Sequence, residues 1–234
     1  MTDNKITEPV TTISLAAARL SIATAIMDQV ILISLIFIRP DLDPSWHTIS
    51  EWAIGPYGWI MSMAFFISAV SYGSLFVAIR SQIQGIWGKI GLSILLVCTF
   101  GLIGVGIFTT DPLDTPQNAL STTGTIHLIS GLSQLMLLPF AALLINLNLA
   151  LKNKAWLSAR RVLLWTAGLP LLGLAGFLVH LSIFVIPLGE GAYGPGVPLG
   201  WPPRFLFLTY MVWLITLAWQ AIKVSSQRSS QITT

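Results

Sequence analysis

The run from Ile90 to Phe108, IGLSILLVCTFGLIGVGIF, decides how the rest of the sequence is interpreted. It follows Lys89 and contains no Asp, Glu, Lys or Arg. An α-helix rises 1.5 Å per residue, so about 20 apolar residues are enough to cross the roughly 30 Å hydrocarbon core of a membrane. The run therefore predicts a transmembrane helix.

Five further runs of similar length lie on either side of it, each bounded by charged or turn residues. The six predicted transmembrane helices cover residues 20–38, 59–79, 90–108, 126–151, 162–186 and 205–222. Across the 234 residues, 54% are hydrophobic and only 9% are charged, and the mean hydropathy is +0.79. A soluble domain of this composition would aggregate. The predicted fold class is all-α integral membrane, a six-transmembrane-helix bundle forming a single membrane domain over residues 1–234.

Charged residues divide the connections between these runs into two groups. Basic residues flank alternate connections, at Lys5, Arg19, Arg80, Lys89, Lys152, Lys154, Arg160, Arg161, Lys223 and Arg228. By the positive-inside rule this side faces the cytoplasm. We therefore expect cytoplasmic tails at 1–13 and 224–234, in a multi-pass protein of a prokaryotic inner (plasma) membrane.

The predicted exterior side contains the more informative connections. Asp43 followed by Pro44 is typical of a helix start, and the segment 45–53 predicts a short interfacial helix on the outer surface. Three- and four-residue spacing would place His47, Ser50 and Glu51 on one face of that helix.

All three histidines fall in the exterior half of the predicted bundle. His47 lies on the surface helix, His127 at the mouth of the fourth run and His180 in the outer part of the fifth, while Asp111 leaves the third run at the same level. Three imidazoles and a carboxylate are ligand types that a catalytic zinc uses, with one position left for water. The hypothesis is zinc-assisted hydrolysis of a lipid or other amphiphile, with the three histidines as metal ligands and Ser50, Glu51 and Asp111 as catalytic residues.

Two other interpretations of these residues stay open. They could form a metal-free polar network that lines a cavity, or each could have its own structural role. The sequence does not show whether the side chains converge in space.

Asp28 is a second candidate because it falls near the middle of the first run, where an ionised carboxylate costs several kcal/mol unless it is neutral, paired or hydrated. Gln134 and Thr166 are possible neutral partners for it. The sharper interpretation is a proton or ion pathway, which would make the chain a small permease. A non-catalytic assembly partner in the membrane is the remaining alternative.

Nucleotide-binding and redox enzymes are disfavoured functions, because the sequence lacks the motifs that they use. It contains one cysteine and no paired-cysteine motif, and it has no phosphate-binding glycine loop. We expect membrane lipids as partners and no nucleic acid, while protein partners are not defined by the sequence.

Three short motifs carry a family resemblance: Ile49-Ser50-Glu51 with Gly58, Gly104-x-Gly106-x-Phe108-x-x-Asp111, and Gly124-x-x-His127. With these motifs the chain resembles a prokaryotic family of six-helix membrane proteins, the domain of unknown function 998. That resemblance implies the fold and the membrane location, and no reaction. More distantly, the exterior Ser, Asp and His set is similar to that of the alkaline ceramidase and adiponectin receptor superfamily of zinc-dependent amidases, which have seven helices and a paired-histidine motif in the last one.

Overall fold

The computed structural model describes residues 12–189 and 191–232. The helices in chain order are α1 (Leu15–Ile38), α2 (Gly58–Ile79), α3 (Gly85–Ile107), α4 (Thr122–Lys152), α5 (Arg160–Ala167), α6 (Leu169–His180) and α7 (Trp201–Ile232). Short helices lie between them, at η1 (Ile49–Ala53), η2 (Arg80–Gln82), η3 (Gln117–Ala119), η4 (Lys154–Ala159), η5 (Leu181–Val185) and η6 (Ile186–Leu188). Within the described ranges there is no strand, and six helical segments are long and apolar enough to cross a membrane. The predicted all-α, six-helix class is confirmed.

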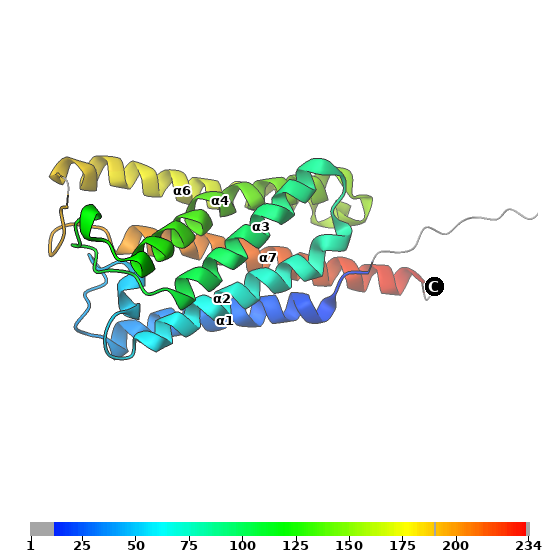
Figure 1. The fold of residues 1–234 in the computed structure, drawn as a ribbon. Helices are drawn as coiled ribbons and strands as arrows, with labels where there is room; N and C mark the ends of the chain where they lie inside the picture. The colour runs from blue at the N-terminus through cyan, green and yellow to red at the C-terminus, as the bar shows by residue number, and fades with distance from the viewer. Residues whose placement is uncertain (1–11, 190, 233–234) are drawn as a thin grey trace, which may run out of the picture.

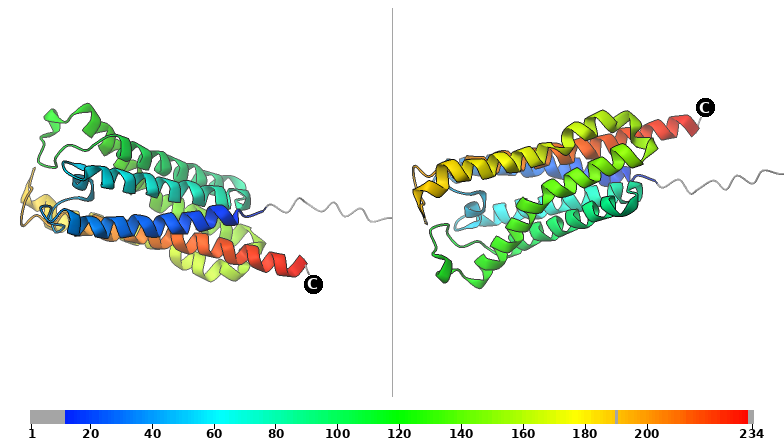
Figure 2. Two further views of the ribbon diagram at one scale, coloured as in Figure 1. Left: turned by 90° about the horizontal axis from the view of Figure 1, so that it is seen from below. Right: turned by 90° about the horizontal axis from the view of Figure 1, so that it is seen from above.

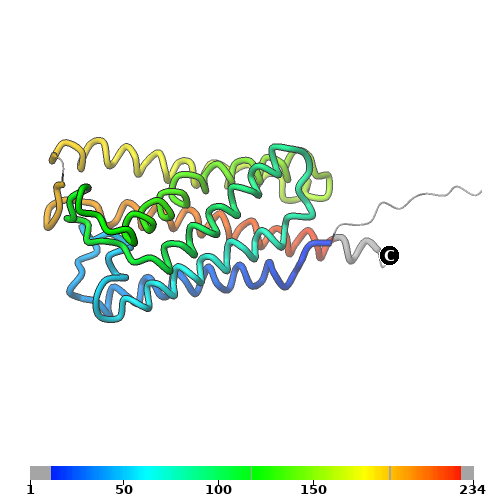
Figure 3. Tube along the Cα trace, viewed as in Figure 1, coloured from blue at the N-terminus to red at the C-terminus, as the bar shows by residue number. Residues whose placement is uncertain are grey.

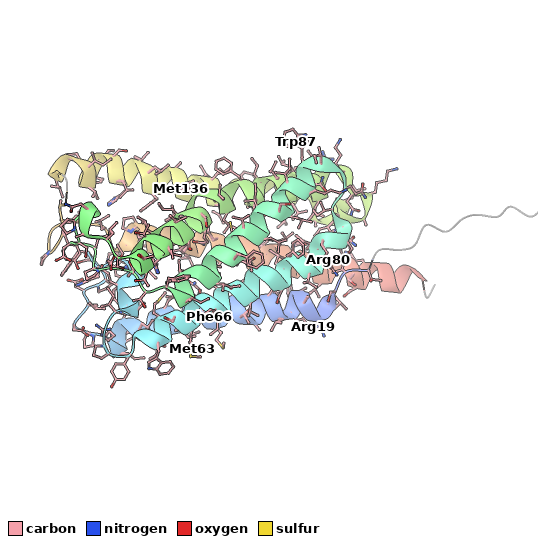
Figure 4. The ribbon with its side chains drawn as sticks, in the orientation of Figure 1. Arg19, Met63, Phe66, Arg80, Trp87 and Met136 are labelled. Carbon is pink, nitrogen blue, oxygen red and sulfur yellow. The ribbon has the colours of Figure 1, made fainter. Side chains whose placement is uncertain are left out.

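The chain runs back and forth along one long axis (Figures 1 and 3). Helices α1, α2, α3 and α4 pack on one another in chain order, and α7 returns to pack beside α1 (Figure 2). Helix α6 contacts α7 and α4 at the edge of the bundle. Apolar side chains such as Met63, Phe66 and Trp87 point outward (Figure 4) and are 48%, 39% and 68% exposed, as expected for a surface surrounded by lipid chains.

The two ends of the bundle differ in chemistry. One end, called the histidine end here, consists of the connections 39–57, 108–121 and 189–200 as far as they are described, with the helix turns beside them. The opposite end, the basic end, holds the start of α1, the connections around η2 and η4, and the end of α7. Arg19 and Arg80 lie toward the basic end (Figure 4). Which end faces the cytoplasm stays a prediction.

The fifth crossing is segmented rather than continuous. Helix α5 ends at Ala167, and α6 begins at Leu169 with Pro170 in its first turn. Proline has no backbone N–H and its ring clashes with the preceding turn, so the helix restarts there. The segment then widens into a π-helical turn at η5 and narrows into a 3₁₀ turn at η6, and Gly189, with a positive φ of 98°, follows.

Several helix boundaries differ from the predicted ones. Helix α3 begins at Gly85 rather than at residue 90, and α7 continues to Ile232 through the predicted tail 224–234. An apolar run shows only which residues can lie in the hydrocarbon core. The backbone hydrogen bonds of a helix can continue beyond that core, so a helix can be longer than its apolar run. Most of the predicted tail 1–13 lies outside the described residues.

The predicted surface helix at 45–53 is wrong in extent. Asp43 Oδ1 accepts from Ser45 N at 2.8 Å, and its carbonyl accepts from His47 N at 3.1 Å, so Asp43 caps a turn. Helix η1 starts only at Ile49, where Thr48 and Glu51 form a capping box. The side chain of Asp43 satisfies the local backbone in a turn and so competes with helix formation there.

Candidate functional site

A cavity of about 330 Å³ lies between the helices and opens to the surface beside the exposed side chains of Leu128 and Leu132; it is the basis of the candidate site. Its walls are mainly apolar, with polar groups gathered at two levels. At the histidine end the polar lining residues are Thr48, Ser50, Thr110 and His127, and deeper in the bundle they are Asp28, Ser68 and Gln134. The two competing sequence hypotheses, one built on exterior residues and one on Asp28, therefore concern the same cavity.

Ser50 and His127 form a hydrogen-bonded pair at the histidine end. Ser50 Oγ lies 3.0 Å from His127 Nε2, and His127 Nδ1 lies 2.7 Å from the carbonyl oxygen of Phe108. A carbonyl only accepts hydrogen bonds, so Nδ1 carries the proton, and in a neutral ring Nε2 then accepts from the Ser50 hydroxyl. The arrangement presents a serine hydroxyl to an imidazole whose tautomer and orientation are set by a third group.

The helix turn that carries Ser50 is held by its neighbours. Glu51 Oε2 accepts from Thr48 N at 2.8 Å, which closes the capping box. Glu51 Oε1 accepts from the Tyr193 hydroxyl at 2.7 Å, so η1 is tied to the last connection. Burial of Tyr193 and its bond to Glu51 raise the pKa of the tyrosine above its ordinary value. The predicted catalytic residue Glu51 is 5% exposed and fully engaged in these contacts.

The start of α4, which carries His127, is held by Asp111. Ser121 caps α4 by accepting from Gly124 N at 2.9 Å. Asp111 accepts from Ser121 N at 2.7 Å and from Ser121 Oγ at 2.8 Å. A carboxylate at a helix N-terminus is favourable because it faces the positive end of the helix dipole. Asp111 therefore positions His127 through the helix start, and it is not among the residues that line the cavity.

The connection after α1 is held together by hydrogen bonds from Arg39. Arg39 is 6% exposed and donates to Asp41 at 2.7 Å and to the carbonyls of Ile54 and Pro56 at 2.9 and 2.8 Å. Hydrogen bonds from Arg39 lower the pKa of Asp41. The bonds hold the two sides of the 39–57 connection together below η1.

Asp28 defines the deep level of the cavity. It lies ten residues before the end of α1 at Ile38, which is about 15 Å along the helix axis. It is 4% exposed, accepts from Gln29 Nε2 at 2.9 Å and has Ser68 as a second hydrogen-bonding neighbour.

The predicted partners of Asp28 do not pair with it. Gln134 donates to the Tyr72 hydroxyl at 3.1 Å, and Thr166 accepts from Asn146 at 3.1 Å. Gln134 and Ser68 still line the cavity together with Asp28, whereas Thr166 packs elsewhere on the α4–α5 contact. The positions of these residues along the sequence are compatible with pairing to Asp28, but the rotation of each helix directs their side chains to other partners.

The other two predicted zinc ligands, His47 and His180, are bonded to local backbone. His47 Nδ1 lies 3.1 Å from the carbonyl of Asp43, and its ring stacks on Trp46 with 3.6 Å between centroids. His180 Nε2 lies 2.7 Å from the carbonyl of Pro198. Over the described ranges, no three His, Cys, Asp or Glu side chains are grouped so that they could hold a metal ion. Zinc binding by His47, His127 and His180 stays a prediction.

Two features of the site were missed by the sequence interpretation. The carbonyl of Phe108, which orients His127, carries no signal because every residue has a carbonyl. Tyr193 contacts Glu51 across 142 residues of sequence, which no local pattern reveals. The Thr48-x-x-Glu51 capping box, by contrast, could have been found, since this spacing is a known signature of a helix start.

Within residues 12–189 and 191–232, six helices that are long and apolar enough to cross a membrane define the chain as a polytopic α-helical membrane protein. The family model described as "Protein of unknown function (DUF998)" matches residues 22–220, and the chain belongs to this family. No curated protein and no solved structure matches it. The motif residues that carry the resemblance meet in space, since Phe108 and Asp111 contact His127 and the start of α4. The more distant similarity to the ceramidase and adiponectin receptor superfamily stays a resemblance.

Proposed function

We propose that the chain hydrolyses an ester of a lipid or other amphiphile in this cavity, with Ser50 as nucleophile and His127 as general base. The observation that carries the proposal is the Ser50 Oγ to His127 Nε2 distance of 3.0 Å, with the opposite ring nitrogen held by Phe108. This order of groups matches the nucleophile, base and orienting group of serine hydrolases, with a carbonyl in place of the carboxylate. Such a constellation is recognised by geometry rather than by sequence order.

The proposed reaction has two steps. Ser50 Oγ attacks the ester carbonyl carbon while its proton moves to His127 Nε2, and the leaving alkoxide takes that proton as the alcohol departs. Water then attacks the acyl-serine ester, again passing a proton to Nε2, and release of the acid restores the Ser50 hydroxyl. Leu128, Leu132 and Leu135 are among the apolar lining residues that would contact the hydrocarbon part of the substrate.

Zinc assistance is the competing form of the same proposal. In that form His47, His127 and His180 bind the metal, and Glu51 and Asp111 serve in proton transfer. The zinc form requires His180 as a metal ligand, whereas the serine–histidine form does not use it. His180 is hydrogen bonded to the carbonyl of Pro198 and makes no hydrogen bond to Ser50. Metal content of the purified protein, measured beside the activity of a His180 variant, separates them.

A serine-directed probe tests the proposal. An alkyl fluorophosphonate should phosphonylate Ser50 as fluoride leaves, and mass spectrometry should locate the adduct on the peptide that contains Ser50. Labelling should disappear in Ser50→Ala and persist in Ser45→Ala, which removes an exposed serine from the same connection. Labelling that is absent from the native protein, or that survives Ser50→Ala, would contradict the assignment.

A second candidate function is proton-linked passage of a small solute that uses Asp28. A carboxyl group that is 4% exposed, lies in mid-membrane and lines a cavity supports it. In proteoliposomes, Asp28→Asn should abolish proton flux while leaving fluorophosphonate labelling of Ser50 intact. Ser68→Ala, which changes a neighbouring residue of the same cavity, is the matched control. Proton flux that is unchanged in Asp28→Asn would contradict this candidate.

A further inference from the structure

A second hollow lies on the outside of the bundle, between α1 and α7. These helices pack side by side (Figure 2), and the crevice between them has a volume of about 200 Å³. Ile33, Phe205 and Leu208 line it and are 58%, 63% and 47% exposed, so it opens toward the surrounding hydrocarbon. Its upper rim at the histidine end is formed by Trp52, Trp201 and Arg204.

Arg204 presents a fixed positive charge at that rim. Its Nη1 donates to the carbonyls of Gly200, His47 and Pro44 at 2.6, 2.9 and 3.3 Å. Its guanidinium carbon lies 4.4 Å from the centroid of the Trp52 ring. A guanidinium held in this way has lost its rotational freedom before any ligand arrives, which lowers the entropic cost of binding.

The charge of Arg204 is not matched by an ion pair. Among the described residues, no carboxylate oxygen lies within 4.0 Å of it, and its Nε and Nη2 donate no hydrogen bond. Glu51 is near enough for its charge to be felt, but its two oxygens accept from Tyr193 and Thr48. Arg39, at the same end, is by contrast paired with Asp41. The N–H groups of Nε and Nη2, on a residue that lines an apolar crevice, are complementary to an anionic headgroup with a hydrocarbon chain.

The crevice adjoins the cavity. Four apolar residues line both hollows: Leu32, Ile49, Met61 and Phe207. At the deeper level Gln29 lines the crevice, Asp28 lines the cavity, and the two are hydrogen bonded at 2.9 Å. A chain lying in the crevice would therefore contact side chains that also line the cavity containing Ser50.

We propose that the crevice binds an anionic phospholipid, with an acyl chain between α1 and α7 and the phosphate on Nε and Nη2 of Arg204. Binding stands on the crevice and Arg204 alone. The further step, that this lipid enters the cavity past Phe207 as the substrate, rests on the proposed function. The substrate class is then an anionic membrane lipid that enters sideways from the bilayer.

Lipid binding to Ser50→Ala protein tests the site without turnover. Native mass spectrometry in detergent should show phosphatidylglycerol binding about tenfold more tightly than phosphatidylcholine, whose phosphate is offset by its own choline. Arg204→Gln should reduce the preference to near one. Inorganic phosphate alone should not compete, because it cannot occupy the crevice. Equal binding of the two lipids, or a preference that survives Arg204→Gln, would overturn the proposal.

A second variant guards against misfolding, since Arg204 also holds three carbonyls. Leu208→Trp should fill the crevice, leave Arg204 in place and lower phosphatidylglycerol affinity about tenfold. Leu172→Trp is the matched control, because Leu172 lies on α6 and is 72% exposed. Unchanged affinity in Leu208→Trp would overturn the site. If binding follows these expectations but native protein does not cleave the bound lipid, the substrate step fails while the site stands, and fluorophosphonate labelling of Ser50 decides separately whether the proposed function also fails.

Discussion

His127→Asn is expected to lower ester hydrolysis by at least about 100-fold, the usual range for loss of a general base. The asparagine amide can still donate to the carbonyl of Phe108, as Nδ1 does across 2.7 Å. It has no basic nitrogen at the position of Nε2, which lies 3.0 Å from Ser50 Oγ. The variant therefore keeps the contact between α3 and α4 and removes only proton transfer. Turnover of a medium-chain p-nitrophenyl ester by protein in detergent is the measurement.

The matched control is His180→Asn. His180 lies on the carbonyl of Pro198 and does not contact Ser50, so its loss should change turnover by less than about twofold. A His180 variant as inactive as the His127 variant, in protein that binds stoichiometric zinc, would contradict the serine–histidine form and favour the zinc form. Equal activity of His127→Asn and native protein would contradict both.

Gly124→Ala should damage the fold of the site at the start of α4. A Cβ at this position would collide with the Asp111 carboxylate, and the backbone nitrogen of Asp111 is only 3.1 Å away. Overpacking of this kind costs about 1–3 kcal/mol, and the strain would fall on the helix start that positions His127. We expect a lower thermal unfolding midpoint in detergent, together with reduced fluorophosphonate labelling of Ser50.

Gly176→Ala is the control for that substitution. Gly176 lies in α6 with open space around it, so a methyl group there should be neutral or slightly stabilising. The double variant Asp111→Ala with Gly124→Ala should cost less than the sum of the two single changes, because the first removes the atoms that the second meets. Additive costs would show that the steric account of Gly124 is wrong.

Much of the architecture follows from local properties of the chain. A membrane-spanning segment must satisfy its own backbone hydrogen bonds, so a run such as 90–108 has only the helix available to it. Pro170 agrees with the break between α5 and α6, because proline has no backbone N–H and fits the first turn of a new helix, although Pro139 lies inside the continuous helix α4. The surface helix is shorter than predicted. The Asp-Pro pair at residues 43 and 44 is compatible with either a helix cap or a turn, and in the structure Asp43 caps a turn.

The site depended on information that no local pattern contains. Residue type alone identifies Ser50, Glu51 and Asp111 as catalytic candidates, whereas a metal centre of His47, His127 and His180 also requires that the three side chains lie close together. The structure pairs Ser50 with His127 across 77 residues, ties Asp111 to Ser121, and leaves His180 on a separate backbone carbonyl. Each histidine is hydrogen bonded to a backbone carbonyl, of Asp43, Phe108 or Pro198, since an unpaired imidazole in a nonpolar environment is costly.

The sequence by itself determined six apolar helices, two chemically different ends and the set of polar residues able to carry chemistry, because hydropathy and charge act residue by residue. Only the tertiary structure decided that Asp28 and His127 line one cavity, that Ser50 meets His127, and that Arg204 stands above a crevice between α1 and α7. These relations depend on the rotation and depth of helices packed against one another. Packing sets those through contacts between residues distant in sequence, which hydropathy does not encode.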